Sequence, residues 1–340
     1  MFDGNFPHGR SVLSSMMLLT LLARGPACLS STHVREPVSI IFDTDMGYNI
    51  DDAAALGILH KLADNGEAKI LAVMTCNRNK WSAAVCDIIN TYYGRPDVPI
   101  GSAKKGPYHK RFWNRYWERL VSQFPHDLTS GHEAPDTTEI YRRILAEEPD
   151  KNVIIVAVGF LTNLKELLDS KPDRFSELSG AELIRQKIGK LVAVGGGYSS
   201  AGKHQTWSFK ADASAAKLVV ENWPTPIVFT GREIGEKIRT GARLRAEEPQ
   251  DSPLRIVYDC VLTRLKEKAH PSWDQTAVLY AVRGLRGYWS EHTTGCNYIH
   301  DDGRNEWKLA PNKDHSYLVE KMGPNEVARV IEDLLLQSPK

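Results

Sequence analysis

Short apolar runs alternate with amphipathic stretches along most of this chain. The apolar runs have the length and composition of buried strands, at Ser39–Phe42, Ala68–Thr75, Val153–Val158, Lys190–Val194 and Ile227–Thr230. Between these runs, apolar residues at helical spacing predict helices at Ala53–Ala63, Ser82–Tyr93, Thr137–Glu147, Leu161–Ser170 and Ala213–Asn222. The same spacing predicts helices at Ser252–Lys268, after Asp274 and at Pro324–Leu336. This alternation predicts an α/β fold with a mostly parallel central β-sheet flanked by helices.

The N-terminal segment differs from the rest of the chain. Residues 12–23 form an apolar run that is too short to span a bilayer, and small residues follow it. We interpret residues 1–30 as a secretory signal peptide, with a disordered tail as the alternative. This interpretation predicts export to the periplasm or the extracellular space, without a membrane partner once the signal is removed. No internal repeat or low-complexity linker divides the remainder, so residues 37–337 are expected to form a single domain.

Composition and charge narrow the function only slightly. The 340 residues include 43 Lys and Arg against 42 Asp and Glu, which gives a formal net charge of +1. Such a balance provides no overall field to attract nucleic acid or an anionic membrane. The four cysteines beyond the leader show no CxxC spacing, which argues against a structural zinc site, and they predict no particular disulfide pairing.

Residues 104–119 combine basic and aromatic side chains. Such a segment could stack on the bases of a single-stranded nucleic acid. It could also be a helix with a buried aromatic face and solvated basic head groups, or a cover that supplies aromatic faces to a planar ligand. The near-zero net charge argues against the first interpretation, and we expect no nucleic-acid partner.

The candidate chemistry is concentrated directly after the first predicted strand. Four aspartates follow within a few residues, and an Ala- and Leu-rich helical pattern begins immediately after them: Asp43, Asp45, Asp51 and Asp52. In open α/β sheets, ligands bind at the carboxyl ends of the strands. A pair of like charges about 4 Å apart costs roughly 4 kcal/mol at an effective dielectric constant near 20. Helix capping would explain one or two of these residues, whereas four together favour a site for Ca²⁺ or Mg²⁺.

This turn resembles the aspartate signature of the nucleoside hydrolases, the inosine/uridine-preferring N-ribohydrolases. Further segments that resemble the family occur in family order, at Ile155–Leu164, Val192–Tyr198, Asp212–Ala216 and Ser272–Leu279. Together these markers cover nearly the whole predicted domain. The resemblance identifies the chain as a divergent, exported, bacterial-type member with a Rossmann-like core and a site at the carboxyl ends of the strands.

The resemblance also implies roles for particular residues. The implied ligands of a Ca²⁺ are the carboxylates of Asp45, Asp52 and Asp274 and the backbone carbonyl of Val158. Asp45 would also act as the general base toward a water molecule. The implied contacts to ribose hydroxyls are Asp51 and Asn77. The resemblance further implies a small nucleoside or riboside as the partner molecule, and a homodimer or homotetramer.

The chain departs from the family at places that bear on the substrate. Asp45 and Asp51 are further apart than in the best-known members, which leaves open which of Asp51 and Asp52 binds the metal. Thr206, Trp207 and Ser208 stand where the family has the Glu-Phe-Asn or Glu-Trp-Asn stretch that binds ribose. Replacing a charged hydrogen bond by a neutral one could remove roughly 1.5–3 kcal/mol of sugar binding.

Another departure concerns the leaving group. Trp273 stands where purine-protonating members have a histidine, and it could stack on a base but cannot protonate it. Other histidines that could serve as the acid are His109, His126 and His204. We therefore expect Ca²⁺-dependent hydrolysis of the N-glycosidic bond of a ribonucleoside or related riboside, giving ribose and free base. The alternative is a metal-dependent nucleoside- or sugar-binding protein with weakened or lost hydrolysis.

Overall fold

The computed structural model describes Met1 and residues 36–47, 49–107, 115–198, 204–309 and 313–337. The predicted signal peptide lies outside this range, Met1 apart. From Glu36 onward, the chain forms one compact unit.

An eight-stranded sheet forms the centre of this unit. Its strands, from one edge to the other, are β10 (Trp289–His292), β13 (His315–Glu320), β7 (Ile227–Thr230), β5 (Ile188–Val194), β4 (Val153–Ala157), β1 (Val38–Thr44), β2 (Ala68–Thr75) and β3 (Ile100–Ser102). Neighbouring strands run parallel, except that β10 is antiparallel to β13 at the edge. The prediction of a mostly parallel sheet is therefore confirmed.

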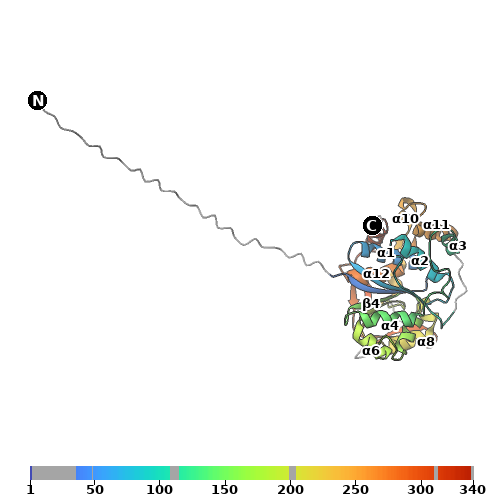
Figure 1. Ribbon diagram of the computed structural model, residues 1–340, viewed down its shortest axis with the longest axis vertical. Coiled ribbons are helices and arrows are strands. Elements are labelled where there is room, and N and C mark those ends of the chain that lie inside the picture. The colour runs from blue at the N-terminus through green and yellow to red at the C-terminus, as the bar shows by residue number, and fades with distance from the viewer. Residues whose placement is uncertain (2–35, 48, 108–114, 199–203, 310–312, 338–340) are drawn as a thin grey trace. The chain divides into compact units, whose positions relative to one another are not determined.

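Helices cover both faces of the sheet and define two hydrophobic clusters (Figure 1). One face carries α1 (Asp51–Asp64), α2 (Ser82–Tyr92), α11 (Pro253–Leu265), α12 (Trp273–Arg283) and α13 (Pro324–Leu335). The other carries α4 (Thr137–Glu147), α5 (Thr162–Leu168), α6 (Gly180–Lys187) and α8 (Ala213–Asn222). Strand β1 contributes to both, because Ile40 and Phe42 belong to the first cluster and Ile41 to the second. A strand buried on both faces explains why its sequence is continuously apolar.

Shorter elements complete the unit. The strands β11 (Cys296–Ile299), β12 (Arg304–Lys308) and β6 (His204–Gln205) form a small sheet, and β8 (Arg239–Thr240) pairs with β9 (His270–Pro271). The remaining helices are α3 (Tyr116–Gln123), α7 (Trp207–Lys210), α9 (Arg232–Lys237) and α10 (Ala242–Glu247). The sequence pattern did not predict these elements, nor α6, β3, β10 and β13. Most are shorter than the windows over which hydrophobic periodicity can be recognised.

The basic and aromatic segment at residues 104–119 is described only at its two ends. There, α3 begins with Tyr116, which is fully buried, and Trp117 stacks on Trp81 with ring centroids 4.7 Å apart. At the other end, the Nζ of Lys104 donates hydrogen bonds to the carbonyls of Gly131 and Ala134. These aromatic side chains therefore pack into the protein, as the helical interpretation of this segment expects.

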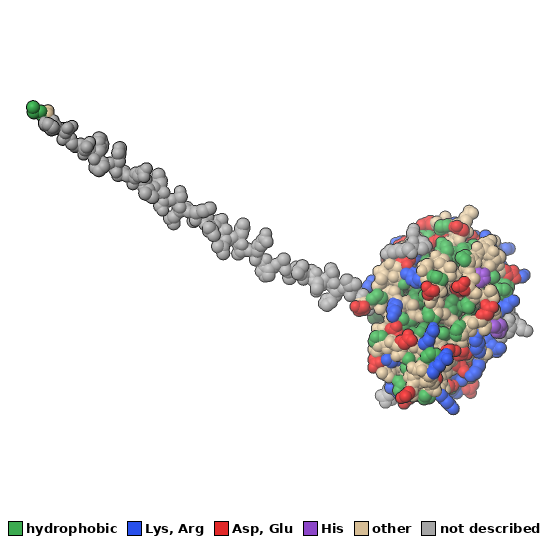
Figure 2. Space-filling model, viewed as in Figure 1, with side chains coloured by type: hydrophobic (Ala, Val, Ile, Leu, Met, Phe, Trp, Pro, Cys, Tyr) green, Lys and Arg blue, Asp and Glu red, His purple; other side chains and the backbone are tan. Residues whose placement is uncertain are grey.

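Acidic and basic side chains are interspersed on the face shown in Figure 2, in keeping with the formal net charge of +1. The cysteines Cys76, Cys86, Cys260 and Cys296 are all free thiols. Within the described part of the chain, every helix is too short or too polar to cross a bilayer.

Candidate active site

The turn after β1 lies at the carboxyl end of the central strands. Asp43 pairs with Ala157 in the register of β1 and β4, and the N–H of Val158 donates to the carbonyl of Asp43 at 2.8 Å. The next residue, Gly159, lies so close to this turn that an added Cβ would be 2.6 Å from the backbone nitrogen of Asp45. Gly47 in the same turn has a φ of +103°, which favours glycine. The β4–α5 connection and the aspartate turn are thus held directly against each other.

Three carboxylates from the first turns of two helices lie close together. Asp51 and Asp52 occupy the first turn of α1, and Asp274 occupies the first turn of α12. Carboxylate oxygens of these three residues lie within 4.8 Å of one another, and all three side chains are buried. The positive ends of the two helix dipoles favour negative charge at this position. Neither dipole removes the mutual repulsion of the three carboxylates.

Asp45 lies beside this cluster and has a protein partner of its own. The indole Nε1 of Trp207 donates a hydrogen bond to Oδ2 of Asp45 at 3.0 Å. The neighbouring Thr44 donates its hydroxyl to Oδ1 of Asp52 and accepts a hydrogen bond from the N–H of Met46 at 3.0 Å. The strand end, the turn and the first turn of α1 are therefore joined into one hydrogen-bonded unit.

Burial and mutual repulsion make these carboxylates hard to ionise without a cation. Burial raises the pKa of Asp45 to about 6, although the hydrogen bond from Trp207 opposes this shift. Burial also raises the pKa of Asp51 to about 7, with a contribution from the charge of Asp45. The pKa values of Asp52 and Asp274 are raised well above the ordinary value by burial, and the neighbouring aspartates raise them further.

The donor set fits a hard divalent cation. Within the described part of the chain, no ion pair joins a basic side chain to Asp45, Asp51, Asp52 or Asp274. No basic side chain among the described residues therefore neutralises the negative charge of the cluster through an ion pair. Carboxylate oxygens in this number are the ligands that Ca²⁺ and Mg²⁺ prefer. The site can accordingly hold such an ion.

Asp43 has a different environment, although it belongs to the same turn. Its Oδ2 accepts a hydrogen bond from the hydroxyl of Tyr141 at 2.7 Å, and both of its carboxylate oxygens accept from Nδ2 of Asn163 at 3.1 Å. These partners lie on α4 and α5, on the opposite face of the sheet from α1. Burial still raises the pKa of Asp43 to about 7. Asp43 therefore links the sheet to its helices and is not part of the acidic cluster.

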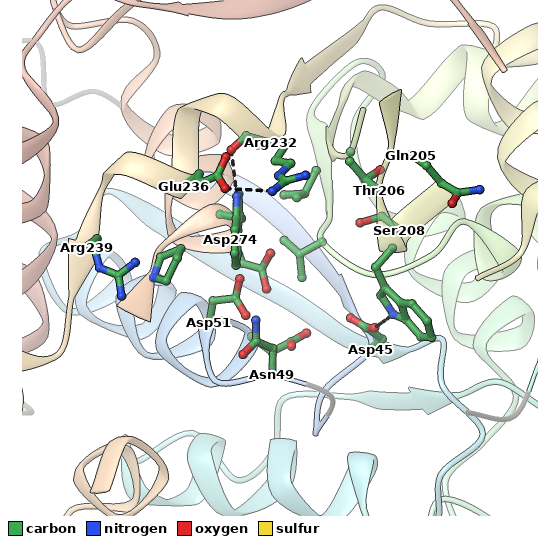
Figure 3. A pocket seen from close by; sticks show the side chains of 17 residues that line it. Asp45, Asn49, Asp51, Gln205, Thr206, Ser208, Arg232, Glu236, Arg239 and Asp274 are labelled. Atoms are coloured by element: carbon green, nitrogen blue, oxygen red, sulfur yellow. Dashed lines mark hydrogen bonds and ion pairs between the residues drawn. The ribbon is translucent and has the colours of Figure 1, made fainter. Parts of the chain in front are cut away.

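A cavity of about 420 Å³ opens above the aspartates. Figure 3 shows Asp51 and Asp274 between two unlike walls. The first wall, near Asp45, contains Gln205, Thr206 and Ser208, and Trp207 joins it through its hydrogen bond to Asp45. The second wall, on the other side of Asp274, contains Arg232, Glu236 and Arg239. Pro271, which pairs with Arg239, and Trp273, which donates to the carbonyl of Arg232, complete this wall. The aspartates thus form the floor of a pocket large enough for a small molecule.

The structure brings together nearly all residues that the sequence predicted for the site. Those that line the cavity are Asp45, Asp51, Asp52, Val158, Thr206, Trp207, Ser208, Trp273 and Asp274. Asn77 is fully buried outside this lining, where its Oδ1 accepts from the N–H of Asn79 at 3.3 Å. Of the histidines considered as acids, His126 and His204 also lie outside the lining, and His109 falls outside the described residues.

Sequence reasoning missed several lining residues. Asn49 lies within the aspartate turn itself, and its carbonyl accepts a hydrogen bond from the hydroxyl of the buried Tyr116 at 3.1 Å. Arg232, Glu236 and Arg239 follow the end of β7. Because charged residues directly after a central parallel strand face the ligand edge of the sheet, their position could have identified them.

Solved structures with the same fold were found among nucleoside hydrolases. The chain is similar to the plant nucleoside hydrolase PpNRh1, with 17% identity, a TM-score of 0.67, and coverage of 89% of this chain and 100% of that one. It is similar to the purine-preferring ribonucleoside hydrolase from Gardnerella vaginalis, with 16% identity, a TM-score of 0.68, and coverage of 88% and 99%. It is also similar to the inosine-uridine preferring nucleoside hydrolase from Bacillus anthracis, with 14% identity, a TM-score of 0.66, and coverage of 88% and 99%.

These identities are low enough that the structural likeness establishes only the fold. No curated protein matches the chain in sequence. The family itself is shown by a sequence match to the inosine-uridine preferring nucleoside hydrolases that extends over residues 40–322. This match includes the aspartate turn, both walls of the cavity and Asp274. The chain therefore belongs to the inosine-uridine preferring nucleoside hydrolase family, and with it to the hydrolases that act on N-glycosyl bonds.

Proposed function

We propose that this chain catalyses the Ca²⁺-dependent hydrolysis of the N-glycosidic bond of a ribonucleoside or related riboside, with ribose and a free base as products. The observation that carries this proposal is the floor of the cavity. Four buried aspartates without a cationic protein partner, among the described residues, lie beneath a space large enough for a nucleoside. A buried cluster of this kind is stable and ionised only when a cation neutralises it.

The proposed ligands of the ion all line the cavity. They are Asp45, Asp52, Asp274 and the backbone carbonyl of Val158. Asp51 lies close enough to Asp52 and Asp274 to act with them, and we assign it to the ribose hydroxyls. When bound, Ca²⁺ supplies positive charge that lowers the pKa of a nearby water and orients the sugar diol. Hard oxygen ligands make Ca²⁺ a suitable ion for this set.

The remaining steps depend on side chains of this protein. A carboxylate oxygen of Asp45 accepts a proton from the water as the water oxygen bonds to the anomeric carbon. The bond from that carbon to the base nitrogen breaks, and its electron pair leaves with the base. Positive charge develops on the sugar ring in an oxocarbenium-like transition state, and the surrounding carboxylates stabilise it. Asp51 accepts hydrogen bonds from ribose hydroxyls and holds the sugar in place.

The first wall offers the ribose neutral polar groups. Thr206 and Ser208 present hydroxyls to the cavity, and the Oγ1 of Thr206 also accepts a hydrogen bond from the N–H of Gly196 at 3.0 Å. Each hydroxyl can donate to a sugar oxygen, at about 0.5–1.5 kcal/mol per neutral hydrogen bond. We therefore propose that ribose binding depends more on the acidic floor than on this wall.

The proposal is tested by incubating the purified protein with a panel of nucleosides and simple ribosides and measuring released reducing sugar. We expect release that requires Ca²⁺ and stops on addition of a chelator. The substrates that react identify the aglycone. Absence of release across the panel, with Ca²⁺ still bound, would contradict the proposed hydrolysis.

One contact favours a second candidate, a metal-dependent protein that binds a nucleoside or sugar without efficient hydrolysis. The indole of Trp207 occupies one oxygen of Asp45, the proposed general base. A carboxylate that already accepts a hydrogen bond has a lower pKa and is therefore less able to take a proton from water. Tight Ca²⁺-dependent binding of a nucleoside that is recovered intact would support this candidate, and its turnover would exclude it.

A further inference from the structure

The second wall of the cavity has a chemistry that the proposed hydrolysis leaves unused. It is built where α9 and the β8–β9 pair meet the start of α12. The indole Nε1 of Trp273 donates to the carbonyl of Arg232 at 2.9 Å, and Arg239 pairs with Pro271 in the register of β8 and β9. A Cβ on Gly235 would be 2.4 Å from the Cα of Trp273, so α9 and α12 are in close contact. The two arginines therefore project from a closely packed support.

Only one nitrogen of each guanidinium group donates a hydrogen bond to another described residue. The Nη2 of Arg232 donates to Glu236 at 2.9 Å, and the Nη2 of Arg239 donates to Glu267 and to the carbonyl of Ala269. The Nε and Nη1 of both arginines have no hydrogen-bond partner among the described residues. Both side chains are about half exposed and line the cavity. Each is thus oriented by a glutamate and retains donors for a ligand.

The same wall lacks a group that could protonate a departing base. Among the described residues that line the cavity there is no histidine, lysine, cysteine or tyrosine. Glu236 accepts a hydrogen bond from Arg232 as an ion-paired carboxylate, and the indole N–H of Trp273 is already engaged. A guanidinium remains protonated throughout the accessible pH range, so it can donate hydrogen bonds but cannot transfer a proton.

We propose that Arg232 and Arg239 select acidic heterocycles, whose ring nitrogen readily carries negative charge, and stabilise the base as it departs as an anion. The catalytic part of this inference rests on the proposed function. As the glycosidic bond breaks, the electron pair passes to the base nitrogen, and the negative charge spreads onto the carbonyl oxygens attached to the ring, to which the arginines can donate hydrogen bonds. The departed base takes up its proton from solvent. Electrostatic stabilisation of the leaving group thus replaces acid catalysis.

The experiment compares uridine, 5-fluorouridine and 5-methyluridine, which differ at one ring position and in the acidity of the base. Arg232→Gln and Arg239→Gln are each assayed with all three. For uridine we expect kcat/KM to fall about tenfold or more, the effect of losing one charged hydrogen bond. The fall in kcat/KM should be smallest for 5-fluorouridine, whose heterocycle is the most acidic of the three, and largest for 5-methyluridine, whose heterocycle is the least acidic. An equal fall for all three substrates would contradict the inference, since a merely structural defect has no dependence on base acidity.

Two controls separate this effect from a loss of structure. Arg243→Gln removes an arginine that is similarly exposed and similarly paired with a glutamate four residues later, outside the cavity. It should leave the three rates unchanged. Arg239→Lys keeps a positive charge and should retain more activity toward 5-methyluridine than Arg239→Gln does. Loss of activity in Arg239→Lys equal to that in Arg239→Gln would count against charge as the cause.

A binding measurement distinguishes this inference from the proposed function. Xanthine is more acidic than hypoxanthine and differs from it by one carbonyl oxygen. Calorimetry should show tighter binding of xanthine to the wild-type protein, and this preference should disappear when Arg232 and Arg239 are both replaced by Gln. If no nucleoside is hydrolysed but the preference is found, the proposed function fails and the selectivity of the wall stands. If hydrolysis occurs but neither test depends on the arginines, the inference fails alone.

Discussion

Asp43 and Asp45 lie two residues apart at the end of β1, but their carboxylates lie in different environments. Asp43 faces α4 and α5, where Tyr141 and Asn163 donate hydrogen bonds to its carboxylate. Asp45 faces the cavity, where its neighbours include further aspartates and the indole N–H of Trp207 donates to its carboxylate. Both carboxylates are buried. The first is satisfied by the protein, whereas the second belongs to a group that requires a cation.

Because both carboxylates are buried, burial does not distinguish the structural Asp43 from the functional Asp45. Their hydrogen-bond partners and charged neighbours do. Neutral donors compensate the desolvation of Asp43 in part, because hydrogen bonds to a carboxylate favour its charged form. The cluster of Asp45, Asp51, Asp52 and Asp274 adds repulsion to desolvation, and this combination destabilises the folded protein until an ion binds. The uncompensated charge therefore indicates the site, and four variants or conditions can test the distinction.

The largest effect is expected for Asp45→Asn. An amide cannot accept the proton from water, so kcat should fall by about 10²–10⁴-fold, as is typical for loss of a general base. Released ribose measures the loss, and a melting temperature in chelator that is no lower than that of the wild-type protein shows that the fold persists. Wild-type turnover in this variant would remove Asp45 from the proposed mechanism.

Asp274→Asn should chiefly change metal binding. Removal of one carboxylate from the buried trio reduces the attraction for Ca²⁺. We expect the Ca²⁺ affinity to fall about tenfold or more, which corresponds to about 1.4 kcal/mol or more of binding free energy. The same change removes repulsion, so the chelated variant should melt above the chelated wild-type protein. Calorimetry with Ca²⁺ provides the first test and thermal unfolding the second. An unaltered Ca²⁺ affinity would exclude Asp274 as a ligand.

Asp43→Asn is the counterpart on the other side of the strand. The amide that replaces one carboxylate oxygen would face the Nδ2 donor of Asn163, so one buried group loses its partner. The free energy of unfolding should fall by about 1–3 kcal/mol. Denaturant titration in Ca²⁺ measures this loss. Ca²⁺ affinity should be unchanged, and a substantial weakening would show that the two aspartates do not differ as we describe.

A smaller effect is expected from pH on the metal-free protein. The pKa values of Asp43, Asp45 and Asp51 are raised by burial to about 7, 6 and 7. Between the ordinary pKa of aspartate and these values, the folded protein binds more protons than the unfolded chain, so its stability falls as the pH rises. The chelated protein should therefore unfold at lower denaturant concentration at about pH 8 than at about pH 5, and Ca²⁺ should remove the part of this difference that comes from Asp45 and Asp51. A chelated protein that is more stable at the higher pH would contradict uncompensated charge in the cluster.

The sequence was sufficient for the central strands and for the floor of the site. β2 and β7 were predicted with their observed bounds, because strands buried on both faces are continuously apolar. The order of the strands was not predictable, since parallel pairing depends on contacts between distant parts of the chain. β13, which lies next to the edge strand β10, carries the polar residues His315, Ser316 and Glu320 and gave no recognisable pattern.

The second wall shows why part of the site was missed. Arg232 and Glu236 are spaced four residues apart, which is the usual pattern of a solvated surface helix. This spacing hides that α9 packs against Trp273, which holds both residues at the cavity. Asn49 was overlooked for a related reason, because its position is fixed by Tyr116, which is distant in the sequence. Asp51 and Asp52 were found because clustered aspartates after a strand indicate a site even before their distances are known, whereas Asp274 was found only through the resemblance to the family.

The most direct test of the central claim is calorimetric titration of Ca²⁺ into chelated wild-type protein, Asp43→Asn and Asp45→Asn, at the same neutral pH. We predict that wild-type protein and Asp43→Asn bind Ca²⁺ with equal affinity and with release of protons, whereas Asp45→Asn binds it more weakly. Absence of Ca²⁺ binding by the wild-type protein, or an equal loss in the two variants, would contradict the assignment of the cavity floor as a metal site.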